Sequence, residues 1–500
     1  MSLPNRARNL SQPRIRKNKP AIGCDNSPVA PPTIILAIDS AETRLFERYA
    51  AAGHLPFLGR FVNNWRIVEG PHHFCEMGAW TTFWSGVPAV EHGYHCIRRL
   101  LPGQYGVELC HRPLKPCPPF WADFPGAVSL WDAQEVDPDP ALPGEQLCNW
   151  RTSYAERCPP TPASHPESLL PDIEARYGPA SRPVAINLRD TPERREKYFR
   201  QSKERIAATG RLFREALAKG GRDLYIFGTA ELHSAGHLCW TYDDDGERRM
   251  LELHQDMDRE LEAVCRLAPE GAKILAVSAY GIYENYPCSD VAEQILRGLG
   301  YQVAPTGGGR SLKSLLPLPL RRKIGEYLPL ETQERLINEG LRANTDWSRS
   351  VAFGMPTLYT GYIRINLRGR EPQGIVEPGP EYDALVEKIA NDFAQLESPA
   401  PSKIRRIAQL SGGIPQHLPD IMISWQERET PWESVVHPRY QAPIAQHKFH
   451  RSTYHSYRGF IGALDPELLD GIPKTLDIPD VAAHLRRISL GAVLPGKSLI

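Results

Sequence analysis

A short, continuous apolar run that ends in an acidic residue constrains the fold of this chain more than any other feature. Thr33–Ile38 consists of apolar and β-branched side chains, Asp39 follows it, and a helical pattern runs from Ala41 to Ala52. Continuous rather than alternating hydrophobicity is typical of a strand that is buried on both faces. The same order, a buried strand followed by a polar segment, returns at Asp223–Phe227 and at Lys273–Val277.

Long helical patterns lie between these strands, around Lys203–Ala218 and Glu247–Leu267. Buried strands that alternate with helices predict an α/β fold with a mostly parallel central sheet and helices on both faces. Ligands of such sheets collect beyond the carboxyl ends of the strands. We therefore expect Asp39, the segment Glu231–His237 and the segment Ser278–Gly281 to converge on one cleft.

The length of the chain predicts more than one structural part, because single hydrophobic cores stop growing at roughly 250 to 300 residues. The stretch Leu101–Pro183 is rich in Pro, Trp and Cys, has weak periodicity, and is interpreted as a loop-rich insertion. After Gly307 a glycine run gives way to charged helical sequence, which is typical of a small cap. The predicted parts are a tail at 1–30, a core at 31–304 and 350–485, a cap at 305–349 and a second tail at 486–500.

The charge balance excludes a general affinity for nucleic acid. Lys plus Arg and Asp plus Glu both total 59, so the chain has no net basic field that would capture a polyanion. The first twenty residues are basic and contain no acidic side chain, and we interpret them as an unstructured extension, although a basic tail can also touch an anionic membrane or RNA. No apolar stretch has the length of a signal peptide or a transmembrane helix, so we expect no membrane partner.

The ten cysteines are scattered and form no CxxC pair. This spacing excludes zinc ribbons and zinc fingers, and it does not resemble a disulfide framework. Reduced thiols in the cytoplasm are the simplest interpretation. The sequence sets no oligomeric state.

Histidines are the candidate metal ligands. His233 and His237 are four residues apart, a spacing that on a helical turn projects both imidazoles from one face. A third imidazole from the His-rich region 447–455 would complete a three-histidine site with an open position for water. His455 is the candidate there, whereas His447 and His450 are interpreted as polar loop residues. The same His pair also occurs by chance on solvated helices, so the spacing alone leaves both readings open.

Asp39 has two uses that the pattern does not separate. A carboxylate directly after a buried strand is either a ligand or base of a site, or the cap of the helix that follows.

Four segments, in this order, resemble the type I phosphodiesterase and nucleotide pyrophosphatase branch of the alkaline phosphatase superfamily. Two further segments support the resemblance, and together they span most of Thr33 to Gly462. The four are Ile38-Asp39, Gly78–Gly86 with His92-Gly93, Ser234–His237 and His455–Gly459, and the supporting two are Ile365–Val376 and Pro419–Ile423.

The resemblance implies an alkaline phosphatase-like fold and a two-zinc hydrolase with a threonine nucleophile, and this chain departs from that pattern at its reactive positions. The nucleophile position, ten residues before the glycine matching Gly86, is Glu76. The first carboxylate of the family's Asp-x-x-x-His pair corresponds to His233. The Asp-His of a second metal site corresponds to Ala279 and Tyr280.

Carried over position by position, the resemblance implies one metal site made of His233, His237 and His455. The other site keeps Asp39 alone. Random decay would remove ligands from both sites, whereas here one is lost and the other gains an imidazole. We therefore expect one divalent ion, with Zn²⁺ as the best match, and altered chemistry.

The hypothesis that follows is hydrolysis of a phosphodiester or related bond in a small soluble substrate by water that the metal activates. Glu76 is the candidate general base or fourth ligand, Tyr280 or Asp39 orients the substrate, and a carboxylate nucleophile stays open. A covalent intermediate on Thr81 or Thr82 is disfavoured because both lie beyond the nucleophile position. The alternatives are a noncatalytic ligand-binding protein on the same scaffold and a group transferase.

Overall fold

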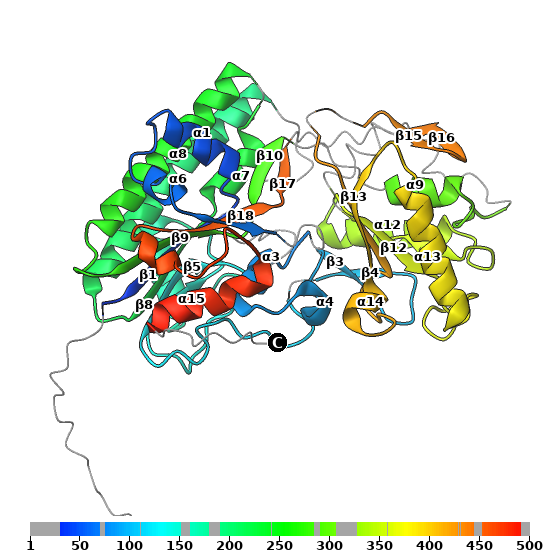
Figure 1. The fold of residues 1–500 in the computed structure, drawn as a ribbon, viewed down its shortest axis with the longest axis horizontal. Coiled ribbons are helices and arrows are strands. Elements are labelled where there is room, and N and C mark those ends of the chain that lie inside the picture. The colour runs from blue at the N-terminus through cyan, green and yellow to red at the C-terminus, as the bar shows by residue number, and fades with distance from the viewer. Residues whose placement is uncertain are drawn as a thin grey trace, which may run out of the picture. The chain divides into compact units, whose positions relative to one another are not determined.

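A nine-stranded mixed sheet forms the centre of the fold in the computed structural model (Figure 1). The structure describes residues 31–70, 76–110, 112–151, 161–179, 191–241, 243–284, 291–306, 328–357, 359–428, 430, 432–444 and 453–491. The predicted tail at 1–30, most of the first half of the predicted cap, the residues after 491, and His447 and His450 lie outside these ranges.

The central sheet has the strand order β19-β2-β18-β9-β1-β8-β5-β6-β7. Strands β8, β1, β9, β5 and β6 run parallel to one another, whereas β18 and β7 pair in the antiparallel sense. The strands are β1 Thr33–Ile38, β2 Arg66–Glu69, β5 Val128–Ala133, β6 Gln146–Cys148, β7 Ala163–His165, β8 Leu224–Thr229, β9 Lys273–Ser278, β18 Arg458–Ala463 and β19 Thr475–Asp477. The predicted α/β class with a mostly parallel sheet is confirmed.

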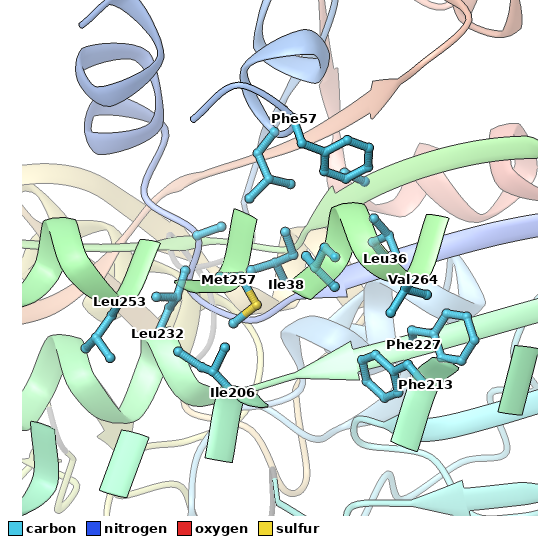
Figure 2. Close-up of a cluster of buried hydrophobic side chains, with 14 of the residues drawn as sticks. Leu36, Ile38, Phe57, Ile206, Phe213, Phe227, Leu232, Leu253, Met257 and Val264 are labelled. Atoms are coloured by element: carbon cyan, nitrogen blue, oxygen red, sulfur yellow. The ribbon is translucent and has the colours of Figure 1, made fainter. Parts of the chain in front are cut away.

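Both faces of β1 are buried, as its continuous apolar sequence predicts. Ile34, Leu36 and Ile38 belong to one apolar cluster, together with side chains from α1, α6, α7 and α8, part of which is drawn in Figure 2. Ile35 and Ala37 belong to the cluster on the opposite face, with side chains from α3 and α15. The helices are α1 Thr43–Ala51, α3 Ala79–Ser85, α6 Pro192–Lys219, α7 Glu231–Leu238, α8 Asp244–Cys265 and α15 Val481–Leu490.

A second, antiparallel sheet has the order β11-β12-β14-β13. Its apolar side chains pack with those of α9 and α13 in one cluster and with those of the β3–β4 hairpin in another. The elements are β3 Arg98–Leu100, β4 Val107–Leu109, α9 Val291–Gly298, α12 Leu330–Ala343, β11 Ala352–Gly354, β12 Gly361–Ile365, α13 Pro380–Ala394, β13 Pro401–Arg406 and β14 Ile421–Trp425. Within the core predicted at 350–485, this sheet occupies the first part of the sequence and β18 and β19 the last.

The remaining short elements connect these two sheets or lie at their edges. They are α2 Gly59–Val62, α4 Ala89–His92, α5 Leu169–Tyr177, β10 Gly281–Glu284, α14 Ile407–Ser411, β15 Ser434–His437, β16 Tyr440–Pro443, β17 Thr453–Ser456, η2 Pro466–Leu469 and η3 Ile478–Asp480. Among the described residues, none of the helices combines the length and the apolar character needed to cross a membrane.

The stretch Leu101–Pro183 contributes more to the core than its sequence predicts. It contains β5, a fully buried strand that pairs with β8, and also β6 and β7. The apolar pattern of β5 is interrupted by Ser129 and Asp132, both of which are buried. Because buried polar side chains break the hydrophobic period, the strand has the sequence signature of a loop.

Candidate metal centre

Helix α7 supplies two of the candidate ligands. It begins directly after β8, at the carboxyl end of the parallel sheet, and His233 and His237 lie one turn apart on it. Gly236 lets the neighbouring strand approach closely, because a Cβ at this position would lie 2.7 Å from the side chain of Ile282. The packing of α7 against Ile282 therefore explains the glycine at position 236.

The third ligand arrives from the far end of the described chain. Strand β17 pairs with β10 in the antiparallel sense, and His455 stands opposite Ile282 in this register. Since β10 follows β9 almost directly and Ile282 contacts α7, the pairing brings His455 to the two histidines of the helix. The β10–β17 ladder thus adds His455 to the segments that follow β1, β8 and β9 at the carboxyl ends of these parallel strands.

The three imidazoles are close enough to share one cation. One ring nitrogen from each of His233, His237 and His455 lies within 4.8 Å of the other two. His233 and His455 are buried, and His237 is partly exposed. Ligand nitrogens of a tetrahedral zinc site are about 2.0 to 2.1 Å from the ion, so a separation of this order needs only small side-chain adjustments.

Asp39 is the hydrogen-bond partner that orients His233. Nδ1 of His233 lies 2.6 Å from Oδ2 of Asp39. A carboxylate only accepts hydrogen bonds, so Nδ1 is the donor in this contact and Nε2 is the ring nitrogen that faces the candidate ion position. This Nε2 lies 3.2 Å from Nε2 of His455.

The two facing Nε2 atoms can share a hydrogen bond or bind one cation. Tyr359 lies at the other side of His455, with its hydroxyl 3.2 Å from Nδ1. With a proton on Nε2, His455 donates to His233 across the 3.2 Å contact; with both Nδ1 atoms protonated, the two Nε2 lone pairs point to a position between the rings. The donor set fits a divalent ion that imidazole binds, of which Zn²⁺ is the commonest choice.

Asp39 lies behind His233 and contributes none of the three ring nitrogens that face the candidate ion position. Its Oδ1 accepts a hydrogen bond from the indole nitrogen of Trp80 at 2.9 Å, and its Oδ2 faces Nδ1 of His233. The cap of α1 is Glu42, whose carboxylate accepts from the backbone amide of Arg44. A carboxylate that orients a metal-bound histidine in this way commonly raises metal affinity.

Tyr280 lies against the same histidines. Its ring centroid is 4.6 Å from that of His455 and 6.2 Å from that of His233. The side chain is buried. The aromatic ring thus forms part of the wall of the metal centre at the position where the resemblance implies a second-site ligand.

Glu76 is buried and its carboxylate is surrounded by donors. Oε1 accepts hydrogen bonds from the backbone amides of Tyr359 and Thr360, at 2.7 and 2.8 Å, and Oε2 accepts from the thiol of Cys96 at 3.2 Å. Glu76 is not part of the three-histidine group, and it reaches His455 through Tyr359.

The start of α3 donates hydrogen bonds to a second carboxylate, that of Glu135. This carboxylate accepts from the backbone amides of Gly78 and Thr81, at 3.1 and 2.8 Å, and from the hydroxyl of Thr81. Burial raises the pKa of Glu135 to about 6, and the nearby charge of Asp39 acts in the same direction. The other threonine of this helix, Thr82, is buried, and its hydroxyl is 2.9 Å from Nε2 of His92.

Sequence reasoning identified the three histidines but missed three neighbours that hold or surround the site: Trp80, Glu135 and Tyr359. Trp80 lies within the motif Gly78–Gly86, where the pattern indicates only helix packing. Glu135 carries no local signal, because the next element after β5 is the strand β6, and the helix end that it contacts, that of α3, lies 54 residues earlier. Tyr359 carries none, since it comes from the second sheet.

No known family profile and no curated protein matches the sequence. Two solved structures that are similar to this chain are crystal structures of phosphonoacetate hydrolase from Sinorhizobium meliloti 1021, one in complex with phosphonoformate and one with phosphonoacetate. In each case the identity is 13%, the match covers 92% of this chain and 95% of the other, and the TM-score is 0.48.

Proposed function

We propose that this chain is a hydrolase that uses one divalent metal ion, held by His233, His237 and His455, to cleave a phosphodiester or related bond in a small soluble substrate. The observation that carries the proposal is the convergence of His233, His237 and His455, whose ring nitrogens lie within 4.8 Å of one another. Three imidazoles in such an arrangement favour a divalent cation.

The proposed ion is Zn²⁺, at one per chain. When bound, a divalent cation at an open three-histidine site lowers the pKa of water and polarises the bond that is cleaved. Asp39 orients His233, and Tyr280 lines the site and is proposed to orient the substrate. Glu76 is proposed as the general base; this role requires that one of its oxygens exchange a present donor for a water molecule.

Direct attack by water is proposed over a covalent intermediate because Thr81 and Thr82 lie beyond the nucleophile position, which is Glu76. The backbone amide and hydroxyl of Thr81 both donate to Glu135, and the hydroxyl of Thr82 is paired with His92. Both hydroxyls therefore have partners within the α3 region.

The test combines metal content with turnover. Purified protein is analysed for metals and then assayed on a chromogenic phosphodiester, a pyrophosphate diester and a phosphomonoester. We expect about one zinc per chain, activity on at least one diester, and loss of both metal and activity in His237→Ala. The exposed His54 provides the matched control, and His54→Ala should keep both. Full turnover by His237→Ala without its ion would disprove the mechanism.

A noncatalytic ligand-binding protein is the second candidate, and the occupied carboxylates favour it. The oxygens of Glu76 and Glu135 accept backbone amide, thiol and hydroxyl donors, which leaves the carboxylate of Glu76 to act structurally. On this alternative the protein binds one ion, is stabilised by a ligand, and hydrolyses none of the three substrates. Turnover that rises with zinc content excludes it.

A further inference from the structure

The segment that leads into β12 contacts the metal centre through one side chain, that of Tyr359. The side chain is buried, and its ring centroid lies 5.9 Å from that of His455 with the two planes nearly perpendicular. The hydroxyl contacts Nδ1 of His455 at 3.2 Å and the backbone carbonyl of Glu76 at 3.4 Å.

A phenolic hydroxyl carries one proton and can give it to one neighbour only. An imidazole that binds an ion through Nε2 carries its proton on Nδ1. With an ion at the proposed site, the Tyr359 hydroxyl, 3.2 Å from Nδ1 of His455, accepts that proton. The hydroxyl's own proton is then directed to the carbonyl of Glu76, which cannot donate.

The hydroxyl is held in place by the backbone on which it stands. The backbone amides of Tyr359 and Thr360 both donate to Oε1 of Glu76, and β12 begins at the next residue, Gly361. His455 is fixed from its own side by the β10–β17 ladder. Both members of the contact between Tyr359 and His455 are therefore positioned by main-chain hydrogen bonds.

We infer that Tyr359 is a positioning residue of the metal centre, because its hydroxyl accepts the Nδ1 proton of His455 and keeps Nε2 of that ring directed at the ion. The inference rests on the proposed three-histidine metal site. It gives His455 the same kind of partner that Asp39 gives His233, a carboxylate in one case and a phenol in the other.

Loss of the Tyr359 hydroxyl favours the tautomer of His455 that carries its proton on Nε2. Without an acceptor at Nδ1, the proton of His455 moves to Nε2, where it can donate to Nε2 of His233 across the 3.2 Å gap. That internal hydrogen bond competes with the ion for the same two nitrogens. Removing an outer partner of a metal-binding histidine typically weakens metal affinity about 10- to 100-fold.

The test compares Tyr359→Phe with Tyr362→Phe. Tyr362 is a matched control because it is also fully buried, lies close by in β12, and donates its hydroxyl to a backbone carbonyl, that of His95. The apoproteins are titrated with Zn²⁺ against a chromophoric chelator, and their folding is checked by circular dichroism. We expect Tyr359→Phe to bind one zinc about 10- to 100-fold more weakly than wild type and Tyr362→Phe to bind it as wild type does.

A second measurement reports the hydrogen bond itself. In zinc-loaded protein labelled with nitrogen-15 at histidine, we expect the Nδ1 proton of His455 to resonate upfield and to exchange faster with water in Tyr359→Phe than in wild type, because it has lost its acceptor. Unchanged zinc affinity and an unchanged Nδ1 proton signal in that variant would overturn the inference, whereas a wild-type protein that binds no zinc would overturn the proposed function instead.

Discussion

Replacing Asp39 by asparagine changes one atom of the proposed metal centre and should remove most of its affinity for zinc. Oδ1 of Asp39 accepts from the indole of Trp80, and Oδ2 accepts from Nδ1 of His233. An asparagine has one acceptor oxygen and one donor nitrogen in place of these two oxygens. It can therefore satisfy Trp80 or hold His233 in the metal-binding tautomer, but it cannot do both.

The size of the effect follows from this conflict. In the apoprotein the amide oxygen turns to Trp80 and the amide nitrogen donates to Nδ1 of His233, so His233 carries its proton on Nε2. Binding of zinc must reverse this tautomer and leave two donors facing each other across a buried 2.9 Å contact. An unsatisfied buried donor costs about 1–3 kcal/mol. At 1.4 kcal/mol per tenfold, zinc affinity should fall by roughly 5- to 150-fold.

The assay is a zinc titration of the apoprotein, with a second variant that removes the conflict. In the double variant Asp39→Asn with Trp80→Phe, the indole donor is gone, and the amide oxygen can turn to His233. Part of the lost affinity should return, although the smaller ring leaves a cavity that lowers stability. Asp258, another buried aspartate that accepts backbone amides away from the histidines, supplies the control Asp258→Asn. Wild-type affinity in Asp39→Asn, or no recovery in the double variant, refutes this reasoning.

Three further predictions concern the base, the packing and the pH dependence. Glu76→Gln keeps an acceptor oxygen for the amides of Tyr359 and Thr360, so zinc content should stay at about one per chain. If Glu76 is the general base, turnover should fall about 10²-fold or more, and full turnover would exclude that role. Gly236→Ala places a methyl group against Ile282 and should lower the free energy of unfolding by about 1–3 kcal/mol, measured in urea, with partial recovery on adding Ile282→Ala. Burial raises the pKa of Asp132 to about 7, so the folded wild type loses stability as pH rises from about 4 to 7. The loss, measured as the difference between urea unfolding curves at pH 4 and pH 8, should be up to the order of 4 kcal/mol. Asn suits the left-handed backbone at this position, and Asp132→Asn should abolish the loss.

The sequence predicted those parts of the fold whose hydrophobic pattern is local and regular. Strands β1, β8 and β9 are continuous apolar runs, and α6 and α8 have long helical periods, so their type and order could be read directly. The parallel arrangement followed from the helices between them. Strand β5 escaped prediction because Ser129 and Asp132 interrupt a short apolar run. Asp132, with φ of 60°, accepts from the backbone amide of Arg151, and Ser129 accepts from the indole of Trp131 in the same strand.

The candidate site divides in the same way. His233 and His237 share a helical turn, so their proximity is a local property. His455 was found through the resemblance and not through spacing, because its place depends on the pairing of β17 with β10. The position of Tyr359 beside His455 depends on contacts between the second sheet and Glu76. No pattern in the sequence predicts these contacts.

The hydrogen bonds of Asp39 also give a physical reason to expect one ion and not two. In the pattern that the motifs resemble, a carboxylate at this position binds a second metal together with an Asp-His pair, and here that pair is Ala279 and Tyr280. The negative charge of Asp39 is instead met by two donors, the indole of Trp80 and the imidazole of His233. A second ion would have to displace both donors and would find no further ligand at Ala279. The hydrogen bond to His233 then couples the two positions, since the carboxylate at the second position orients a candidate ligand of the proposed site.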